Sequence, residues 1–232
     1  MRINRFLANA GYGSRRDVEA IVRAGRVAIN GRALAAEALH TRVGPGDAVT
    51  VDGRDARLPA GQLYYILHKP MGYVVSRRAG KNEKTIYALL PPELQALKYA
   101  GRLDRESRGL LLLSTDGDFI HAVTHPSKRI WKHYRVKVSK LPSEKELRDR
   151  FIRGVEEGGE LLRARAVTGI DREAGMGELI LGEGRKRQIR RMFRALNIRV
   201  LDLYRYQVGP FHLETREIAE GACVPFDPDD LA

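Results

Sequence analysis

The sequence contains a single cysteine, Cys223, among its 232 residues. One thiol cannot form an internal disulfide, and it has no second thiol with which to build a metal cluster or a redox pair. This composition excludes the disulfide-stabilised secreted proteins and the dithiol oxidoreductases. We therefore expect the protein to work in a reducing compartment, the cytoplasm.

Long apolar runs are also missing from the sequence. No segment approaches the roughly 18 consecutive apolar residues of a membrane-spanning helix. Met1-Arg2-Ile3 does not open into the apolar core of a signal peptide. We expect neither a membrane partner nor a cleaved leader. Hydrophobic residues still make up 43% of the chain, which is enough for a sizeable core in one or two domains.

Acidic side chains are in the minority. The 41 lysines and arginines outnumber the 29 aspartates and glutamates and leave a formal charge of +12. Such an excess favours a polyanionic partner, because binding releases the counterions of that partner. Nucleic acid is therefore the expected partner.

The residue pattern predicts two domains. The spacing of Ile3, Phe6 and Leu7 predicts a short helix, and Ser14 is a good N-cap for a second one. Short strands with tight turns follow, the first turn at Asn30-Gly31. Residues 53–62 lack apolar periodicity and contain Gly and Pro, so we expect a linker between a domain of residues 1–52 and one of residues 63–232.

The larger segment mixes strands with a few helices, which predicts an α+β domain. Strands are expected near 64–67, 73–75, 110–114, 134–138, 177–181 and 200–208. One helix is well marked, because Ser143 and Glu146 form a capping-box pattern at its start and Gly154 can end it. The acidic tail from Gly221 is expected to be poorly ordered.

Arginine is concentrated at the N-terminus. Residues 1–32 contain seven arginines against two acidic residues, Asp17 and Glu19. A guanidinium group can bind two phosphate oxygens at once and can stack on a base. The order of two short helices and a strand ending in Asn30-Gly31, through FLANAGYGSRRDVEAIVRAGRVAING, resembles the S-four-like RNA-binding domain. The resemblance implies RNA contacts by Arg2, Arg5, Arg15, Arg16, Arg23 and Arg26.

A second basic cluster occupies residues 185–199, which contain seven cations and no acidic residue. Ile189, Met192 and Phe193 share one face of a predicted helix, so the cations are expected on its other faces. The expected RNA contacts are Arg185, Lys186, Arg187, Arg191 and Arg194. The preceding Gly182-Glu183-Gly184 matches neither a Walker loop nor a dinucleotide fingerprint, and we expect no nucleotide cofactor.

The segment 101–118, GRLDRESRGLLLLSTDGD, places charged residues directly before a buried strand. It resembles the catalytic motif of pseudouridine synthases, in which the aspartate, here Asp104, is the nucleophile. HKPMG at 68–72, KHYRVKV at 132–138 and EGRKRQIRRM at 183–192 resemble further motifs of that family, in the same order and spacing. With the N-terminal domain, residues 1–215 are similar to the branch that modifies uridines in bacterial ribosomal RNA.

The resemblance implies a central, largely antiparallel sheet and a cleft with named roles. Arg190 would pair with Asp104, and Tyr134 would stack on the flipped uracil. Leu203 would close the pocket, and Arg102 would fill the gap left in the RNA. The isomerisation needs no cofactor and no metal, and the residue types leave open whether Asp104 adds to the sugar or to the base.

The sequence offers three alternative functions. His121 and His125 are four residues apart and His133 follows, as in a zinc site, but Pro126 interrupts the helix and no cysteine or carboxylate lies nearby at ligand spacing. Asp116 and Asp118 fit a turn better than a magnesium pair. The main alternative is a non-catalytic ribosome-assembly factor. For partners, we expect ribosomal RNA, free or in pre-ribosomal particles, bound by a monomer.

One residue and one loop depart from the family pattern. Arg108 stands where a small hydroxyl residue is common, and the loop Ser76 to Lys84 is unusually basic. We expect both departures to affect the choice of substrate more than the chemistry.

Overall fold

The computed structural model describes residues 1–58 and 61–231, without the side chains of Arg15 and Leu231. The chain divides into two compact units, Met1–Gln62 and Leu63–Ala232. Each unit has a hydrophobic core of its own.

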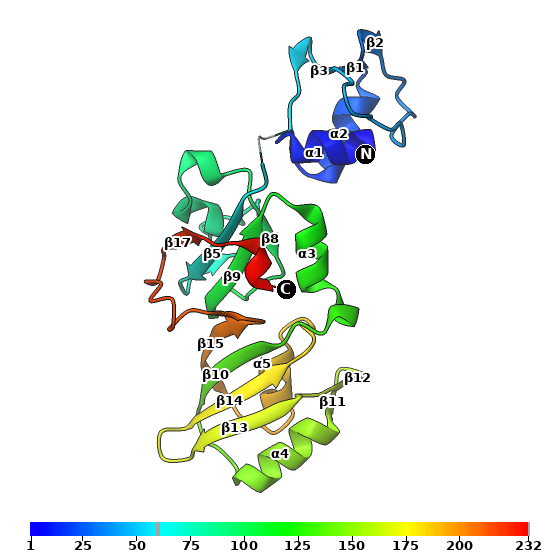
Figure 1. Cartoon of the computed structure of the whole chain (residues 1–232). Helices are drawn as coiled ribbons and strands as arrows, with labels where there is room; N and C mark the ends of the chain where they lie inside the picture. Colours follow the sequence, from blue (N-terminus) through cyan, green and yellow to red (C-terminus); the bar gives the residue numbers. More distant parts are fainter. Residues whose placement is uncertain (59–60, 232) are drawn as a thin grey trace. The chain divides into compact units, whose positions relative to one another are not determined.

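The first unit begins with the two predicted helices, α1 (Ile3–Asn9) and α2 (Arg15–Arg23) (Figure 1). Ser14 caps α2, because its side chain accepts from the Asp17 amide while the Asp17 carboxylate accepts from the Ser14 amide. This reciprocal pair satisfies two amides that the helix cannot bond internally. After α2, Gly25 takes a positive φ of 67° and stops the helix.

The strands of the first unit form a small sheet in the order β2, β1, β3, β4. Their bounds are Val27–Ile29 for β1, Arg32–Ala33 for β2, Val49–Val51 for β3 and Arg54–Asp55 for β4. Asn30-Gly31 and Asp52-Gly53 have positive φ at both residues, as tight hairpin turns require. The turn predicted at Asn30-Gly31 is therefore confirmed.

The segment predicted as a linker begins inside this sheet. Arg54 and Asp55 pair with β3, and Ala56 is buried in the core of the first unit. The sequence alone does not predict β4, because a strand of two residues is too short to show the alternation of buried and exposed side chains. Pro59 and Ala60, also in the predicted linker, lie outside the described residues.

In its described part, the second unit is built on one long mixed sheet in the order β13, β14, β10, β15, β9, β5, β17. All these neighbours are antiparallel except β15 and β9, which run parallel. The bounds are β5 (Tyr64–Lys69), β9 (Arg108–Ser114), β10 (Lys132–Val138), β13 (Ala166–Asp171), β14 (Met176–Leu181), β15 (Val200–Val208) and β17 (Cys223–Pro225).

Short strands extend this sheet or lie beside it. β8 (Lys98–Ala100) pairs with β9, and β16 (Phe211–His212) pairs with β15. Separately, β6 (Tyr73–Val74) pairs with β7 (Lys84–Thr85), and β11 (Val155–Glu157) pairs with β12 (Glu160–Leu162). The predicted strands of this unit are therefore present, although the one near 73–75 lies outside the main sheet.

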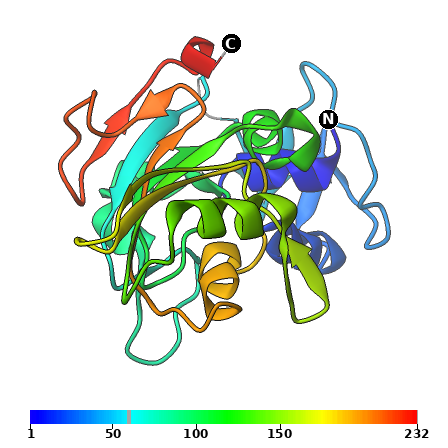
Figure 2. The ribbon, with the colours of Figure 1, turned by 90° about the horizontal axis from the view of Figure 1, so that it is seen from below.

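Helices cover both faces of the main sheet. α4 (Glu144–Arg153) and α5 (Gln188–Arg194) lie side by side on one face (Figure 2) and meet through an edge-on contact of Phe151 and Phe193, 4.9 Å between ring centres. α3 (Gly117–Thr124) packs Phe119 and Val123 against the other face. β9 lies between the two cores.

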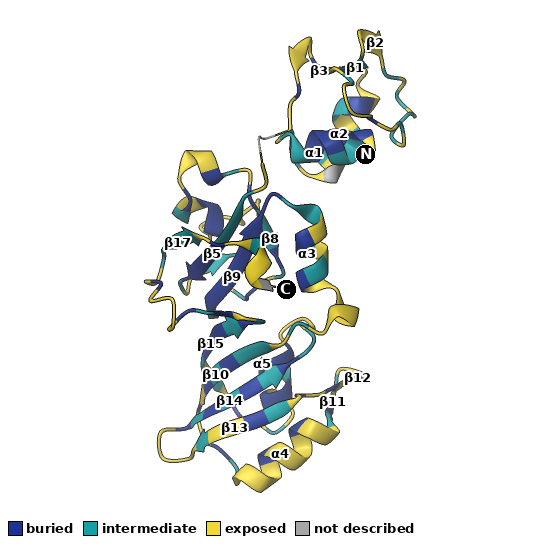
Figure 3. Cartoon of the chain, viewed as in Figure 1, coloured by how far each residue is buried: buried dark blue, intermediate teal, exposed yellow. Residues whose placement is uncertain are grey.

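Burial is greatest along β9, whose residues Leu110 to Leu113 are each at most 1% exposed. Figure 3 shows this strand as buried, whereas the outer surface of α4 is exposed. Burying one leucine side chain contributes roughly 1.5–3 kcal/mol. The strand is therefore a rigid base for the charged turn that precedes it.

The tail departs from prediction. β17 pairs with β5, and Phe226 is 9% exposed against Phe119 and Phe211. The expectation of a poorly ordered tail from Gly221 is wrong, because three residues of strand and one aromatic ring secure it to the sheet. No helix of the described residues is long and apolar enough to cross a membrane.

Candidate active site

Asp104 lies in the turn between β8 and β9. The turn closes through a hydrogen bond of 3.0 Å from the Ser107 amide to the Asp104 carbonyl oxygen. The side chain of Asp104 is 29% exposed, so its carboxylate can reach a substrate. Ser107, in contrast, is buried against the sheet.

Lys69 holds this turn from beneath. Its side chain has no exposed surface, and its Nζ atom donates to the carbonyl oxygens of Ser107 at 2.7 Å and Pro70 at 2.9 Å. Burial, followed by the nearby charge of Arg205, lowers the pKa of Lys69 to about 8. The motif at 68–72 contains Lys69, but the sequence predicts no role for this residue, because a lysine is normally expected at the surface.

Gly109 allows β9 to approach β15 closely. Its φ is 117°, and a Cβ atom at this position would lie 2.2 Å from the carbonyl oxygen of Arg205. No side chain fits there. Arg205 is itself 4% exposed and donates through Nε to the Leu110 carbonyl oxygen at 2.8 Å. The position of Asp104 thus depends on contacts between three strands.

Two arginines from the start of α5 lie next to the nucleophile candidate. Arg190 Nε is 3.9 Å, and Arg187 Nη1 is 3.8 Å, from Oδ2 of Asp104. The side chain of Arg190 is only 13% exposed. Burial, and then the charge of Arg187, lowers the pKa of its guanidinium group. The structure therefore brings Asp104 and Arg190 together, as the motifs predict.

Tyr134 and Leu203 lie on the same face of the sheet. Tyr134 is 7% exposed on β10 and pairs with Arg205, whereas Leu203, 5% exposed on β15, pairs with Val136. Both belong to the core cluster that includes Leu103, the residue before Asp104. The structure therefore places both side chains in the same core as the residue before Asp104, and their roles in the site stay predictions.

Arg102 is exposed in the same segment, two residues before Asp104. Its carbonyl oxygen accepts a long hydrogen bond of 3.5 Å from Arg205. The structure thus places Arg102 at the surface, and the role that the resemblance implies for it stays a prediction.

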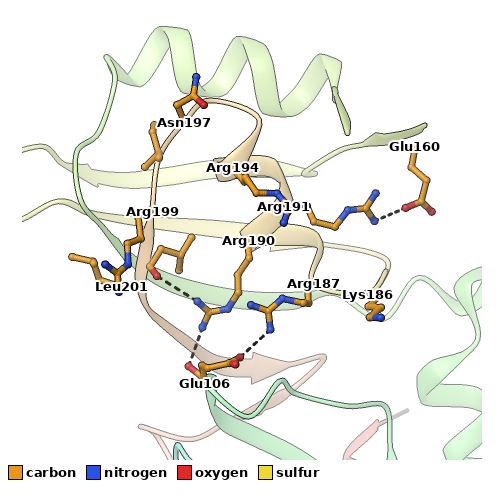
Figure 4. Close-up of a pocket in the computed structure, with 12 residues that line it drawn as sticks. Glu106, Glu160, Lys186, Arg187, Arg190, Arg191, Arg194, Asn197, Arg199 and Leu201 are labelled. Carbon is orange, nitrogen blue, oxygen red and sulfur yellow. Dashed lines mark hydrogen bonds and ion pairs between the residues drawn. The ribbon is translucent and has the colours of Figure 1, made fainter. Parts of the chain in front are cut away.

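Beyond these residues a basic cleft of about 930 Å³ runs along α5 and the start of β15 (Figure 4). Asp104 is not in its lining, but both arginines within 4 Å of Asp104 are. The cleft is therefore linked to Asp104 through Arg187 and Arg190. Its lining is Glu106, Glu160, Lys186, Arg187, Arg190, Arg191, Arg194, Asn197, Ile198, Arg199, Val200 and Leu201.

The basic helix is less free than its sequence suggests, because carboxylates from the β11–β12 hairpin bind it. Arg191 is 16% exposed and bonds to Glu157 at 2.6 Å and also to Glu160. Arg194 is 69% exposed but pairs with Glu157 as well. The geometry of Arg191 argues against the direct RNA contact predicted for it, since all three nitrogen atoms of its guanidinium group donate to Glu157 or Glu160.

The other predicted RNA contacts of the second unit lie at the surface. Lys186 is exposed, and Arg185 is exposed while pairing with Glu183 at 3.1 Å. Arg187 is 42% exposed and bonds to Glu106 at 2.9 Å. Arg185 and Arg187 can therefore exchange internal partners for phosphate, and the exposed Lys186 can also reach one.

The arginines of the first unit are mostly at its surface. Arg2, Arg16 and Arg23 are exposed and Arg5 is half-buried. Arg26 bonds to Asp52 at 2.9 Å. The side chain of Arg15 lies outside what the structure describes. The described residues of the chain contain no group of three potential ligands that could hold a metal ion.

Comparisons with known proteins agree on one family. A family model described as RNA pseudouridylate synthase matches residues 63–195, and a model described as S4 domain matches residues 1–49. The chain is 33% identical over 216 residues to the ribosomal large subunit pseudouridine synthase B of Bacillus subtilis, covering 91% of this chain and 87% of that protein.

Two further similarities extend over most of the chain. The protein of the same description from Escherichia coli (strain K12) is 33% identical over 220 residues, covering 91% of this chain and 75% of that one. A crystal structure of a pseudouridylate synthase superposes with a TM-score of 0.70 at 26% identity, covering 100% of this chain and 98% of the other.

Proposed function

Because the chain belongs to the RNA pseudouridylate synthase family, we propose that it isomerises one uridine of ribosomal RNA to pseudouridine, with Asp104 as the nucleophile. The observation that carries this role is the setting of Asp104. Its carboxylate is partly exposed and lies 3.8–3.9 Å from two guanidinium groups. A protein that only bound RNA would gain nothing from a carboxylate at this place, since it repels phosphate.

The reaction exchanges two bonds of one nucleotide. The bond from the anomeric carbon to ring nitrogen 1 breaks, a bond to ring carbon 5 forms, and a proton leaves carbon 5 while nitrogen 1 gains one. A carboxylate suits the covalent step because it is ionised at neutral pH and can also leave again. Neither an oxidant nor an added group is needed.

Three neighbours of Asp104 have supporting roles in this proposal. Arg190 orients the carboxylate and stabilises its negative charge. Tyr134 offers a ring for the extruded uracil and a hydroxyl group near its moving proton. Leu203 excludes water from that side of the pocket.

The substrate is proposed from charge and from the relatives. The exposed cations of α2 and of the segment before α5 suit a folded RNA, which proteins hold largely by its phosphates. The relatives described above are named for the large ribosomal subunit. We therefore propose large-subunit RNA, with Arg102 filling the place of the extruded base.

Mapping of pseudouridines tests this function. Ribosomal RNA from cells with and without the gene should differ at one uridine of the large-subunit RNA, and the purified protein should modify that uridine in a transcript. Identical maps, together with an inactive purified protein, would contradict the proposal.

The oligomeric state of the protein and the form of its RNA substrate are proposed as well. We propose a monomer that modifies RNA free or in pre-ribosomal particles, because a uridine must be accessible before it can be extruded. Sedimentation of the protein alone, and its activity on free RNA against mature subunits, measure these two points.

A further inference from the structure

One atom of Arg187 lies between two carboxylates. Its Nη1 donates to Oε2 of Glu106 at 2.9 Å (Figure 4) and is 3.8 Å from Oδ2 of Asp104. The hydrogen bond from Arg187 is the main reason why the pKa of the Glu106 carboxyl group is lowered. The guanidinium group of Arg187 is therefore closer to Glu106 than to Asp104. A small rotation of the Arg187 side chain would bring it to Asp104.

Arg190, the second cation near Asp104, is restrained in a similar way. Its Nη2 donates to the carbonyl oxygen of Glu106 at 2.9 Å and to Oγ of Ser107 at 3.3 Å. Its Nε, 3.9 Å from Asp104, is buried and has no hydrogen-bond partner. Within the part of the chain that the structure describes, the Asp104 carboxylate accepts no hydrogen bond.

This arrangement has a chemical consequence. A guanidinium group at almost 4 Å stabilises a carboxylate by charge, but one at hydrogen-bonding distance also occupies a lone pair that the nucleophile needs. Charge-assisted hydrogen bonds are about twice as strong as neutral ones, so a guanidinium group bonded directly to Asp104 would make its carboxylate a weaker nucleophile. Cations held slightly apart stabilise the Asp104 carboxylate by charge without occupying its oxygen atoms.

We propose that Glu106 is a positioning residue of the reaction, which holds Arg187 away from Asp104 and so keeps the nucleophile uncapped. The proposal rests on the proposed function, because it concerns the rate of the same chemical step. Arg190 is restrained mainly by backbone carbonyl oxygens, which no substitution removes. Glu106 restrains Arg187 through its side chain, so this half of the arrangement can be tested.

Substitution of Glu106 should not disturb the fold. The side chains of Glu106 and Arg187 are 57% and 42% exposed, and exposed ion pairs contribute little to stability. The variant Glu106→Gln should therefore unfold at the wild-type temperature.

The first measurement is the single-turnover rate on transcribed 23S ribosomal RNA with saturating enzyme. In Glu106→Gln, Arg187 should close on Asp104 and slow the chemical step roughly tenfold to a hundredfold, the range expected for one hydrogen bond to a charged group. RNA affinity should stay equal or rise slightly, because one negative charge is lost. Substitution of a residue with only a structural role would not lower the chemical rate while leaving RNA affinity unchanged.

A matched control comes from the opposite face of the sheet. Glu214 bonds to Arg135 at 2.9 Å and is 47% exposed, so Glu214→Gln removes an equal pair at a distance from Asp104. Its rate should equal that of the wild type. Turnover by the wild type in this assay tests the proposed function. The single-turnover rate of Glu106→Gln relative to that of the wild type tests the role of Glu106.

The decisive variant combines two changes. If Glu106 acts only by restraining Arg187, the double variant Glu106→Gln with Arg187→Met should be faster than Glu106→Gln alone and match Arg187→Met. A double variant as slow as Glu106→Gln would overturn the proposal, because Glu106 would then act by itself. Unchanged single-turnover rates in Glu106→Gln would overturn it as well.

A crystal structure of Glu106→Gln gives an answer that does not depend on activity. Arg187 should lie within about 3.2 Å of the Asp104 carboxylate, the range of an ordinary hydrogen bond. An unmoved guanidinium group would contradict the restraint assigned to Glu106.

Discussion

Arg190 and Arg194 lie one turn apart on α5, yet 13% of the first side chain and 69% of the second are exposed. Arg190 points to the turn of Asp104, and Arg194 points to Glu157 on the hairpin. Two identical residues on one short helix thus have different surroundings. Their substitutions should have different kinetic effects.

Arg190→Met should mainly slow the chemical step. The change keeps much of the side-chain length, but it removes the charge near Asp104 and the hydrogen bonds to Glu106 and Ser107. We expect a loss of roughly tenfold to a hundredfold in the single-turnover rate.

Arg194→Met should instead raise the half-saturating RNA concentration. It should also lower the slope of log affinity against log salt by less than about one unit. Equal losses of saturated rate would contradict the assigned register of α5.

Asp104→Asn should eliminate pseudouridine formation and leave RNA affinity nearly unchanged. The substitution preserves shape and removes the negative charge that attacks. Conversion of transcribed RNA measures the rate, and a filter-binding titration measures affinity. Wild-type activity should also survive a chelator, since the proposed step uses no metal. Retained turnover in Asp104→Asn would rule out this nucleophile.

Lys69 should make stability depend on pH. Because its folded-state pKa is about 8 and its ordinary value is 10.5, the folded protein binds fewer protons than the unfolded chain between these values. The unfolding free energy contributed by Lys69 should therefore rise with pH across this window. Relative to Lys69→Met, the wild type should gain about 2 kcal/mol between about pH 7.5 and 9.5.

Urea unfolding of both proteins at the two pH values measures this difference, and other titrating groups cancel between them. A difference that does not change with pH would contradict the lowered pKa. Lys69→Met should also impair turnover at neutral pH, because the Ser107 carbonyl oxygen loses its donor at 2.7 Å.

Removal of the first unit, residues 1–62, should weaken RNA binding and reduce its dependence on salt. The slope of log affinity against log salt changes by roughly 0.7 for each phosphate contact on a single strand. The second unit has its own cores and should remain folded by circular dichroism. Unchanged affinity and slope in the truncated protein would show that the first unit does not bind RNA.

Local patterns predicted much of the fold. Continuous apolar residues identified β9, alternation identified β10 and β15, and the cap at Ser143 identified the start of α4. These signals depend on near neighbours in sequence. β17 was missed because three residues that include a proline carry no period, and its partner strand is about 150 residues away.

The site was predicted only in part, for the same reason. Motif resemblance placed Arg190 beside Asp104, but no local pattern shows that Glu157 and Glu160 bind the arginines of α5. Nor does a motif reveal that Lys69 is buried, since its partner carbonyl belongs to Ser107, 38 positions further on. Contacts between distant segments decide both points.

The parallel pairing of β9 with β15 has a consequence for biosynthesis. Arg108 and Gly109 meet Tyr204 and Arg205, so the turn of Asp104 lacks its neighbouring strand until nearly the whole chain has left the ribosome. Pairing over such a distance is slow, and N-terminal units fold first during synthesis. A nascent chain therefore presents a folded first unit well before it has a functional catalytic centre, and a chain released early would be inactive.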